Sequence, residues 1–313
     1  MPAVLHADLP RFVAFGEALT QLTRVGPDLW RSSCAGAPWR VAVALSSLGQ
    51  LSAFAGAVSQ EPFGTALWQA SQDANLDLRF LQQLPRAPLL AVLHSVQPPH
   101  WELIGDDSAD LHFRPEGLPQ GWTRALRWAH FGSLGLVRRP LAGRLIALAQ
   151  ALKGEGRLIS YDPGYRGLPM DSNYDETLEL MCRMADLVRL SEADLRGLFR
   201  VGDVRSGLAQ MAAWNPTGWL LLTRADGSAT LYHGVQECHG QPPPHALGDT
   251  ADMGDAVLAG LLDSLMRDAG APAAQHLRWA LAAGAAACSV TGWVPPRAAV
   301  ADGLASSVRM TPD

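Results

Sequence analysis

Short apolar segments alternate with amphipathic helical segments along most of the chain. Strands are predicted at residues 11–16, 51–57, 128–131, 158–161, 187–190 and 219–223, and helices at residues 37–48, 62–74, 141–152 and 207–213. Two parallel strands need a crossover connection between them, and an α-helix usually supplies it. The alternation therefore predicts an α/β fold with a mostly parallel sheet between layers of helices.

Two segments interrupt this alternation. Residues 19–33 and 88–113 have strand-like patterns but no crossover helix. Antiparallel strands inserted into an α/β fold would form a small flap over one end of the sheet, the end where such proteins bind ligands. At 313 residues the chain is long enough for one large domain. We therefore expect a single domain, residues 1–313, with a β-strand lid formed by about residues 19–33 and 88–113.

Composition excludes several classes of protein. Hydrophobic residues make up 48% of the chain and charged residues 18%, which excludes a disordered protein. The formal net charge of −5 argues against a nucleic-acid partner, whose binding would need a basic surface. The four cysteines form no CxxC pair, so a disulfide framework or a zinc ribbon is not expected. No signal-peptide pattern or membrane-spanning apolar run is found. We expect a cytoplasmic protein with no membrane partner.

One motif combines a helix start with a carboxylate. In residues 247–265, LGDTADMGDAVLAGLLDSL, an apolar helical stripe begins near Met253. The free N–H groups at a helix N-terminus attract phosphate oxygens. Asp255, in the first turn, could accept a proton from a hydroxyl while these N–H groups hold developing negative charge. Alternatively, Asp255 only complements the helix dipole.

This motif resembles the DTxGAGDxF signature of the ribokinase-like (pfkB-type) carbohydrate kinases. Five more segments resemble segments of that family, in the same order and closest to its fructokinase branch. They are CAGAPWRVAVALSSLG at 34–49, EPFG at 61–64, AHFGSLGL at 129–136, SYDPGYR at 160–166 and ADLVRLSEAD at 185–194. The resemblance covers nearly the whole chain.

The resemblance implies a ribokinase-like three-layer sandwich and ATP-dependent phosphorylation of a sugar hydroxyl, with Mg²⁺ as cofactor. Asp255 would be the catalytic base, with Gly254 beside it. The other implied site residues are Asp252, Met253, Gly254 and Arg166 around the phosphate, Gln21, Gly36 and Arg40 on the sugar, Thr223, Gly227 and Thr250 on the nucleotide, and Asp194 near magnesium through water. Separately from the resemblance, Trp101 in the expected β lid could pack in a homodimer interface, since an apolar β flap that no ligand covers needs a partner.

The phosphate-binding motif departs from the family pattern. The family's GAGD is DMGD here, so Asp252 replaces a glycine and Met253 an alanine. Two negative charges about 5 Å apart repel by roughly 3 kcal/mol at an effective dielectric constant of about 20. Unless Asp252 points away or holds a cation, this repulsion weakens ATP binding. An alternative function is therefore a kinase-fold protein that binds sugar or nucleotide without useful turnover.

The sugar and nucleotide motifs depart as well. Gln21 stands where the family has a sugar-binding aspartate, and Arg40 where it has an asparagine. An arginine in the sugar pocket suits a carboxylate or phosphate on the ligand, which makes a kinase for an acidic sugar a further alternative. Alternatively, Arg40 lies on a solvent-exposed face of its helix and does not contact the sugar. The TRADG loop, residues 223–227, is one residue shorter than its family counterpart.

Overall fold

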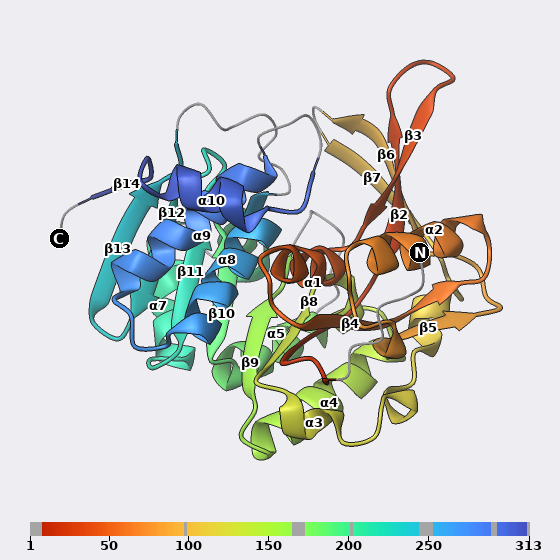
Figure 1. Ribbon diagram of the computed structural model, residues 1–313, viewed down its shortest axis with the longest axis horizontal. Coiled ribbons are helices and arrows are strands. Elements are labelled where there is room, and N and C mark those ends of the chain that lie inside the picture. Colours follow the sequence, from red (N-terminus) through yellow and green to blue (C-terminus); the bar gives the residue numbers. More distant parts are fainter. Residues whose placement is uncertain are drawn as a thin grey trace.

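The computed structural model describes residues 8–96, 99–164, 173–200, 203–243, 253–288 and 293–311 (Figure 1). Three of the predicted site residues, Arg166, Thr250 and Asp252, lie outside these ranges.

A ten-stranded sheet forms the centre of the molecule, in the order β14-β13-β12-β11-β10-β9-β8-β1-β4-β5. The seven strands from β11 to β5 are parallel, and β12, β13 and β14 extend the sheet in an antiparallel manner. The parallel strands are β1 (Phe12–Phe15), β4 (Ser52–Ser59), β5 (Leu81–Leu84), β8 (Trp128–Gly132), β9 (Leu158–Asp162), β10 (Leu187–Ser191) and β11 (Trp219–Thr223); the others are β12 (Ala229–His233), β13 (Gln236–Gln241) and β14 (Arg309–Met310). The mostly parallel sheet predicted from the alternation is confirmed.

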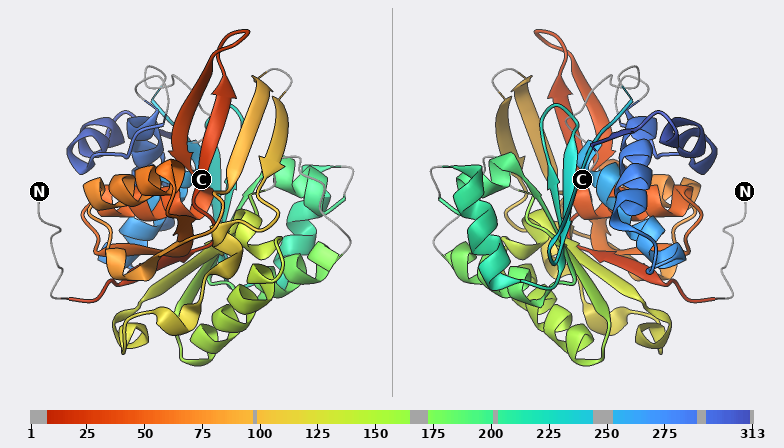
Figure 2. Two further views of the ribbon diagram at one scale, coloured as in Figure 1. Left: turned by 90° about the vertical axis from the view of Figure 1, so that its right-hand side faces the viewer. Right: turned by 90° about the vertical axis from the view of Figure 1, so that its left-hand side faces the viewer.

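Helices cover both faces of this sheet (Figure 2). One layer contains α1 (Ala37–Ser47), α2 (Pro62–Asp73), α8 (Met253–Arg267), α9 (Ala273–Ala287) and α10 (Ala298–Ala305), and the other contains α3 (Trp122–Ala125), α4 (Leu141–Gly154), α5 (Asn173–Met184), α6 (Glu192–Leu198) and α7 (Val204–Trp214). Along β1 the side chains alternate between two cores: Phe12 and Ala14 pack in one, and Val13 and Phe15 in the other. Successive side chains of a strand point to opposite faces, so this alternation produces three layers.

A second sheet projects from the main body at the top of the molecule in Figure 1. It contains β2 (Leu19–Arg24), β3 (Trp30–Ala35), β6 (Leu90–Val96) and β7 (Pro99–Ile104) in the order β3-β2-β6-β7. Both segments that interrupt the alternation contribute strands to it. After β7 the chain leaves this sheet and forms a 3-10 turn, η2 (Ala109–His112), so strand structure ends at residue 104.

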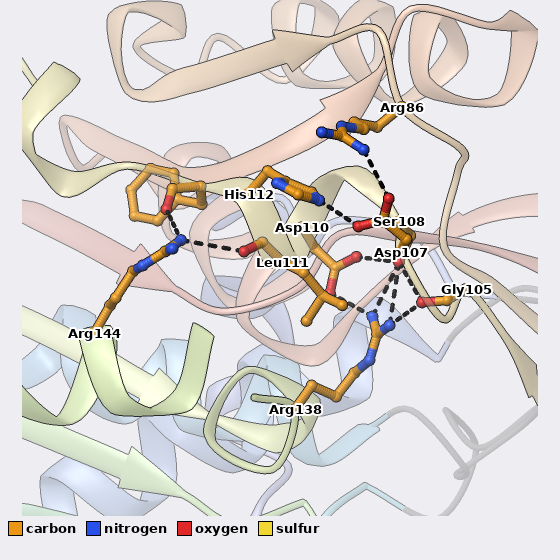
Figure 3. Close-up of polar contacts among 10 residues, drawn as sticks. Arg86, Gly105, Asp107, Ser108, Asp110, Leu111, His112, Arg138 and Arg144 are labelled. Atoms are coloured by element: carbon orange, nitrogen blue, oxygen red, sulfur yellow. Dashed lines mark hydrogen bonds and ion pairs between the residues drawn. The ribbon is translucent and has the colours of Figure 1, made fainter. Parts of the chain in front are cut away.

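Arginines fasten the segment after β7 to the main body (Figure 3). Arg138 donates to the carboxylate of Asp110, to the Ser108 hydroxyl at 3.2 Å and to the carbonyl of Gly105. Arg144 of α4 donates to two backbone carbonyls of the same turn, at 3.2 and 3.1 Å. Charge-assisted hydrogen bonds are among the stronger polar contacts in proteins. The base of the small sheet is therefore held against the layer of α4.

Candidate functional site

Polar residues collect where the parallel strands end. Glu17 follows β1, Ser133 follows β8, and Asp162, Ser191 and Thr223 are the last residues of β9, β10 and β11. Parallel strands end at a common edge, and α/β proteins bind ligands outside that edge. The N-terminus of α8 reaches the same edge, because its first residues line a cavity together with these strand ends.

The first cavity, of about 50 Å³, lies between this edge and the small sheet. All three residues predicted to bind sugar, Gln21, Gly36 and Arg40, line it. The small sheet also contributes Leu19, Ala35, Ala91, Trp101, Glu102 and Leu103, and the main body contributes Glu17, Ala37, Ser133, Leu134 and Gly164. We call it the acceptor cavity.

Arg40 lies inside the protein, on α1, with only 4% of its surface exposed. Its Nη1 atom is 4.0 Å from Oδ2 of Asp255, and its guanidinium lies 5.5 Å from the centre of the Trp293 ring. Placement of Arg40 on a solvated helix face is therefore wrong. The neighbouring Trp39 is buried, and its indole donates to the Ser71 hydroxyl at 2.9 Å, as expected of a core residue.

Gly36 turns the chain from β3 into α1. Its φ angle is +114°, and a Cβ atom there would lie 2.4 Å from the carbonyl oxygen of Glu17. Glycine is the residue type that satisfies both constraints. The glycine of this motif therefore lets the backbone of α1 approach the loop after β1 at the wall of the acceptor cavity.

The second cavity, of about 360 Å³, lies beside the first. Its lining includes all the described residues predicted to contact nucleotide, phosphate or metal: Thr223, Gly227, Asp194, Met253, Gly254 and Asp255. Ala37 and Gly164 line both cavities. Asp255 lines the second cavity and lies 4.0 Å from Arg40 of the first, so its carboxylate lies at their junction. We call the second space the nucleotide cavity.

Arg189 is a central residue of the nucleotide cavity that the sequence analysis missed. Its Nη1 atom donates to Asp162 at 2.9 Å, and its Nη2 atom donates to the Thr223 hydroxyl at 2.9 Å. Burial opposes its charge, but the carboxylates of Asp162, Asp194 and Asp255 outweigh burial and raise the pKa of Arg189. It carries a permanent positive charge at the end of three strands. The sequence feature that could have identified Arg189 is its position as a charged residue inside the apolar strand LVRLS.

Arg189 also explains why residue 254 is a glycine. A Cβ atom on Gly254 would lie 2.0 Å from Nη2 of Arg189, a separation that the two atoms cannot adopt. The guanidinium therefore packs directly against the first turn of α8. Glycine at this position lets α8 begin beside a buried positive charge.

Met253, the first residue of α8, has a buried side chain. A Cβ atom added at Gly284 of α9 would lie 3.0 Å from Cε of Met253, so the methionine side chain packs against the surface of α9 at this glycine. Met253 therefore contributes its side chain to the core, and only its backbone belongs to the helix N-terminus that faces the cavity.

Asp194 caps α6 while lining the nucleotide cavity. Its Oδ2 atom accepts from the Ser191 N–H and hydroxyl, both at 2.5 Å, and its own N–H donates to the Ser191 hydroxyl at 3.1 Å. This reciprocal arrangement is a capping box. Burial and the nearby Asp162 carboxylate raise the pKa of Asp194, whereas Arg189 and Ser191 lower it. The Oδ2 atom of this carboxylate is therefore engaged in the cap of α6.

Oxygen donors suited to Mg²⁺ are present. Asp162, Asp194 and Asp255 all line the nucleotide cavity. Within the described part of the chain, however, no group of three or more histidine, cysteine or acidic side chains is arranged to hold a metal ion. Mg²⁺ commonly binds through one or two carboxylates plus substrate phosphates and water. These residues fit an ion that arrives with a nucleotide.

In the described ranges, none of the helices combines the length and apolar character needed to cross a bilayer.

Comparisons with known proteins agree with this architecture. The sequence matches the pfkB family carbohydrate kinases over residues 12–298. It is 30% identical to a fructokinase of Klebsiella pneumoniae over 80% of this chain and 82% of that protein, and 32% identical to a fructokinase of Salmonella typhimurium over 74% and 76%. The crystal structure of a fructokinase with bound ATP from Xylella fastidiosa superposes with a TM-score of 0.86 at 22% identity, covering 95% of this chain and 99% of that chain.

The family match spans most of the chain, and the two cavities meet at the motif that first suggested a sugar kinase. The predicted ribokinase-like fold is confirmed. The chain therefore belongs to the pfkB family of carbohydrate kinases and transfers a phosphoryl group from ATP to a sugar hydroxyl.

Proposed function

We propose that the acceptor is a neutral ketose of the fructose type and that Asp255 is the base that activates its hydroxyl. The observation that carries this proposal is the position of the Asp255 carboxylate, at the junction of the acceptor and nucleotide cavities. A general base must reach both the acceptor hydroxyl and the site where charge develops. A base at this junction meets both conditions.

In the proposed reaction, Asp255 takes the proton of the acceptor hydroxyl as that oxygen bonds to the γ-phosphorus of ATP. The bond between this phosphorus and the bridging oxygen breaks, and ADP leaves. The backbone N–H groups at the start of α8, from Met253 and Gly254, face the transferred group, and Arg189 adds positive charge beside them. Phosphoryl transfer depends chiefly on alignment and charge neutralisation, which these residues supply.

The remaining roles belong to the same proposal. Arg166 and Asp252 would lie near the phosphates, and Thr223, Gly227 and Thr250 near the nucleotide. Mg²⁺ bound with ATP would neutralise phosphate charge, with Asp194 contacting it through water. Dependence on ATP supports a cytoplasmic location.

Charges in the acceptor cavity favour a neutral sugar over an acidic one. Arg40 is the cation that suggested an acidic substrate, but the Asp255 carboxylate lies 4.0 Å from it. Glu17 and Glu102 add carboxylates to the same lining. An anionic substrate would therefore meet three carboxylates and one guanidinium. The fructokinase relatives, and a Vibrio cholerae fructokinase solved in a fructose-, ADP- and calcium-bound form, support a ketose.

We further propose that the small sheet is a lid over the sugar and the interface of a homodimer. Val25, Leu29, Trp30 and Ile104 are large apolar residues with 39% to 63% of their surface exposed, and all lie on this sheet or its connecting turn. Exposed apolar groups of this kind mark interaction surfaces. Sedimentation at several protein concentrations tests the dimer.

The substrate assignment is tested by ATP-dependent phosphorylation of a panel of ketoses, aldoses and sugar acids with magnesium, together with calorimetry of nucleotide binding. We expect the highest kcat/KM on a neutral ketose. Preference for a sugar acid would support the acidic-sugar alternative and place its carboxylate on Arg40. Nucleotide or sugar binding without turnover on any substrate would support the alternative of a protein without useful activity.

A further inference from the structure

Three adjacent strands of the large sheet each begin directly after an arginine, at the edge opposite the active site. Arg11 precedes β1, Arg127 precedes β8 and Arg157 precedes β9. The strands are in register, since Phe12 is paired with Trp128, and Trp128 with Leu158. Neighbouring strands lie about 4.8 Å apart. The three arginines therefore stand side by side along the edge.

These arginines line one cleft of about 910 Å³. Arg124 of α3 also lines it, and Asp8 is the single acidic residue of the lining, so the cleft carries three net positive charges. Across the described ranges, none of the four arginines forms an ion pair with a carboxylate. This cleft is electropositive in a chain whose formal net charge is −5.

The arginines differ in what they already bind. Arg127 donates to the carbonyls of Met266 and Leu265, at 2.6 and 3.3 Å, near the end of α8. Arg157 Nη1 donates to the carbonyl of residue 126 at 3.1 Å, while its Nε is buried and has no partner among the described residues. Arg11 and Arg124 are exposed. The two inner guanidiniums are thus held in place by carbonyls, and the two outer ones face solvent.

We infer that this cleft binds a small anion that carries phosphate groups. Guanidinium groups match phosphate oxygens in geometry and charge, and they remain protonated at all physiological pH values. Four like charges around one cleft repel one another, and a bound anion offsets that repulsion. A small molecule fits better than a nucleic acid, because the positive charge is confined to one cleft of an acidic protein.

The anion cleft is separate from the ATP site. Strand β1 begins after Arg11 and ends before Glu17 of the acceptor cavity, and β9 begins after Arg157 and ends with Asp162 of the nucleotide cavity. The two sites therefore lie at opposite ends of the same strands. No lining residue of the anion cleft lines the acceptor or the nucleotide cavity, so the inference stands or falls independently of the proposed acceptor.

Arginine footprinting locates the site residue by residue. The full chain is treated with phenylglyoxal with and without inorganic pyrophosphate, and modified arginines are quantified by mass spectrometry. We expect pyrophosphate to slow modification of Arg11 and Arg124 about fivefold or more while Arg183, which is exposed on α5, is unaffected. Absence of protection at Arg11 and Arg124, or equal protection at Arg183, would overturn the inference.

Calorimetry with pyrophosphate supplies a second test. Pyrophosphate also fits the nucleotide cavity, so the measurement compares the wild-type chain with Arg11→Gln/Arg124→Gln and with the control Arg183→Gln. Loss of charged hydrogen bonds to an anion weakens binding about tenfold or more. We expect the double variant to lose one of two binding events while kcat stays unchanged. An identical isotherm in the double variant would refute the anion site.

Discussion

The Arg40 guanidinium and the Asp255 carboxylate face each other at 4.0 Å where the acceptor and nucleotide cavities meet. Both side chains are almost fully enclosed, with 5% and 4% of their surface exposed. In this environment a charge remains stable only beside an opposite charge. The pair therefore places a cation within the acceptor cavity without giving that cavity a net positive charge.

Replacement of Arg40 tests its role in sugar binding. We expect Arg40→Asn to raise KM for the sugar about tenfold, the effect of losing one charged hydrogen-bond donor, and to leave KM for ATP nearly unchanged. Steady-state kinetics with each substrate varied in turn measures both constants. Arg31→Gln, at an exposed position on β3, is the control. An equal rise of both KM values would contradict a role specific to the acceptor cavity.

A methyl group at residue 254 would collide with Arg189. We therefore expect Gly254→Ala to lower kcat/KM at least a hundredfold, because either the start of α8 or the Arg189 guanidinium, which is bonded to Asp162 and Thr223, must move. Gly143→Ala is a matched control, since a Cβ atom there meets nothing within 4 Å, and alanine in a helix stabilises by up to about 1 kcal/mol. Activity assays and thermal unfolding compare the two. Normal kcat/KM in Gly254→Ala would show that Arg189 does not fix this turn.

His130 gives the stability a defined pH dependence. Burial lowers the pKa of His130 to about 4, with Asp162 and Ser160 acting in the opposite direction. The unfolded chain takes up this proton near pH 6.5, whereas the folded chain does so only near pH 4. The free energy of unfolding therefore falls as the pH drops through this window, by about 2 kcal/mol between pH 7 and pH 5.

Urea unfolding at pH 7 and pH 5 measures this loss. In His130→Gln we expect a smaller decrease between the two pH values, while the exposed control His100→Gln keeps the wild-type decrease. The same decrease in all three proteins would assign the pH dependence to other groups.

Asp263 joins α8 to α9 and to the loop after α1. Its fully buried carboxylate accepts from Gln50 at 2.7 Å, Arg267 at 3.0 Å and Trp279 at 2.8 Å. We expect Asp263→Asn to lower the free energy of unfolding by about 3 kcal/mol, because charged hydrogen bonds are lost in a buried place. Denaturant unfolding should show the loss, with kcat unchanged and the exposed Asp302→Asn nearly neutral. A marked fall in kcat without a change in stability would contradict this purely structural role.

Local patterns predicted six of the seven parallel strands, because a buried strand and its crossover helix each have a characteristic spacing, but they missed β5 and the helices α5 and α9. The alternation revealed none of the antiparallel strands β12, β13 and β14 at the sheet edge, which are short, and β13 and β14 are mostly polar. Arg189 was missed for a different reason. Its importance comes from contacts with Asp162 and Thr223, residues 27 and 34 positions away in the chain. A single sequence does not encode such contacts in any local spacing.

The burial of Arg40 could not be predicted from the sequence either. The sequence placed it correctly in a motif, but a helix position alone does not decide between solvent and cavity. The structure settles its burial and brings it within 4.0 Å of a residue 215 positions further along. Predicted contacts at Arg166, Thr250 and Asp252, including the repulsion expected at Asp252, remain predictions.

The turnover of Asp255→Asn tests the proposed role of Asp255 as the base in ATP-dependent sugar phosphorylation. General-base catalysis contributes about 10²- to 10⁴-fold, so kcat on the preferred sugar should fall by that factor. KM for ATP should change little, and the unfolding temperature should fall because Arg40 loses its buried partner. The exposed control Asp302→Asn, on α10, should retain both activity and stability. A folded Asp255→Asn protein with wild-type kcat would show that Asp255 is not the base.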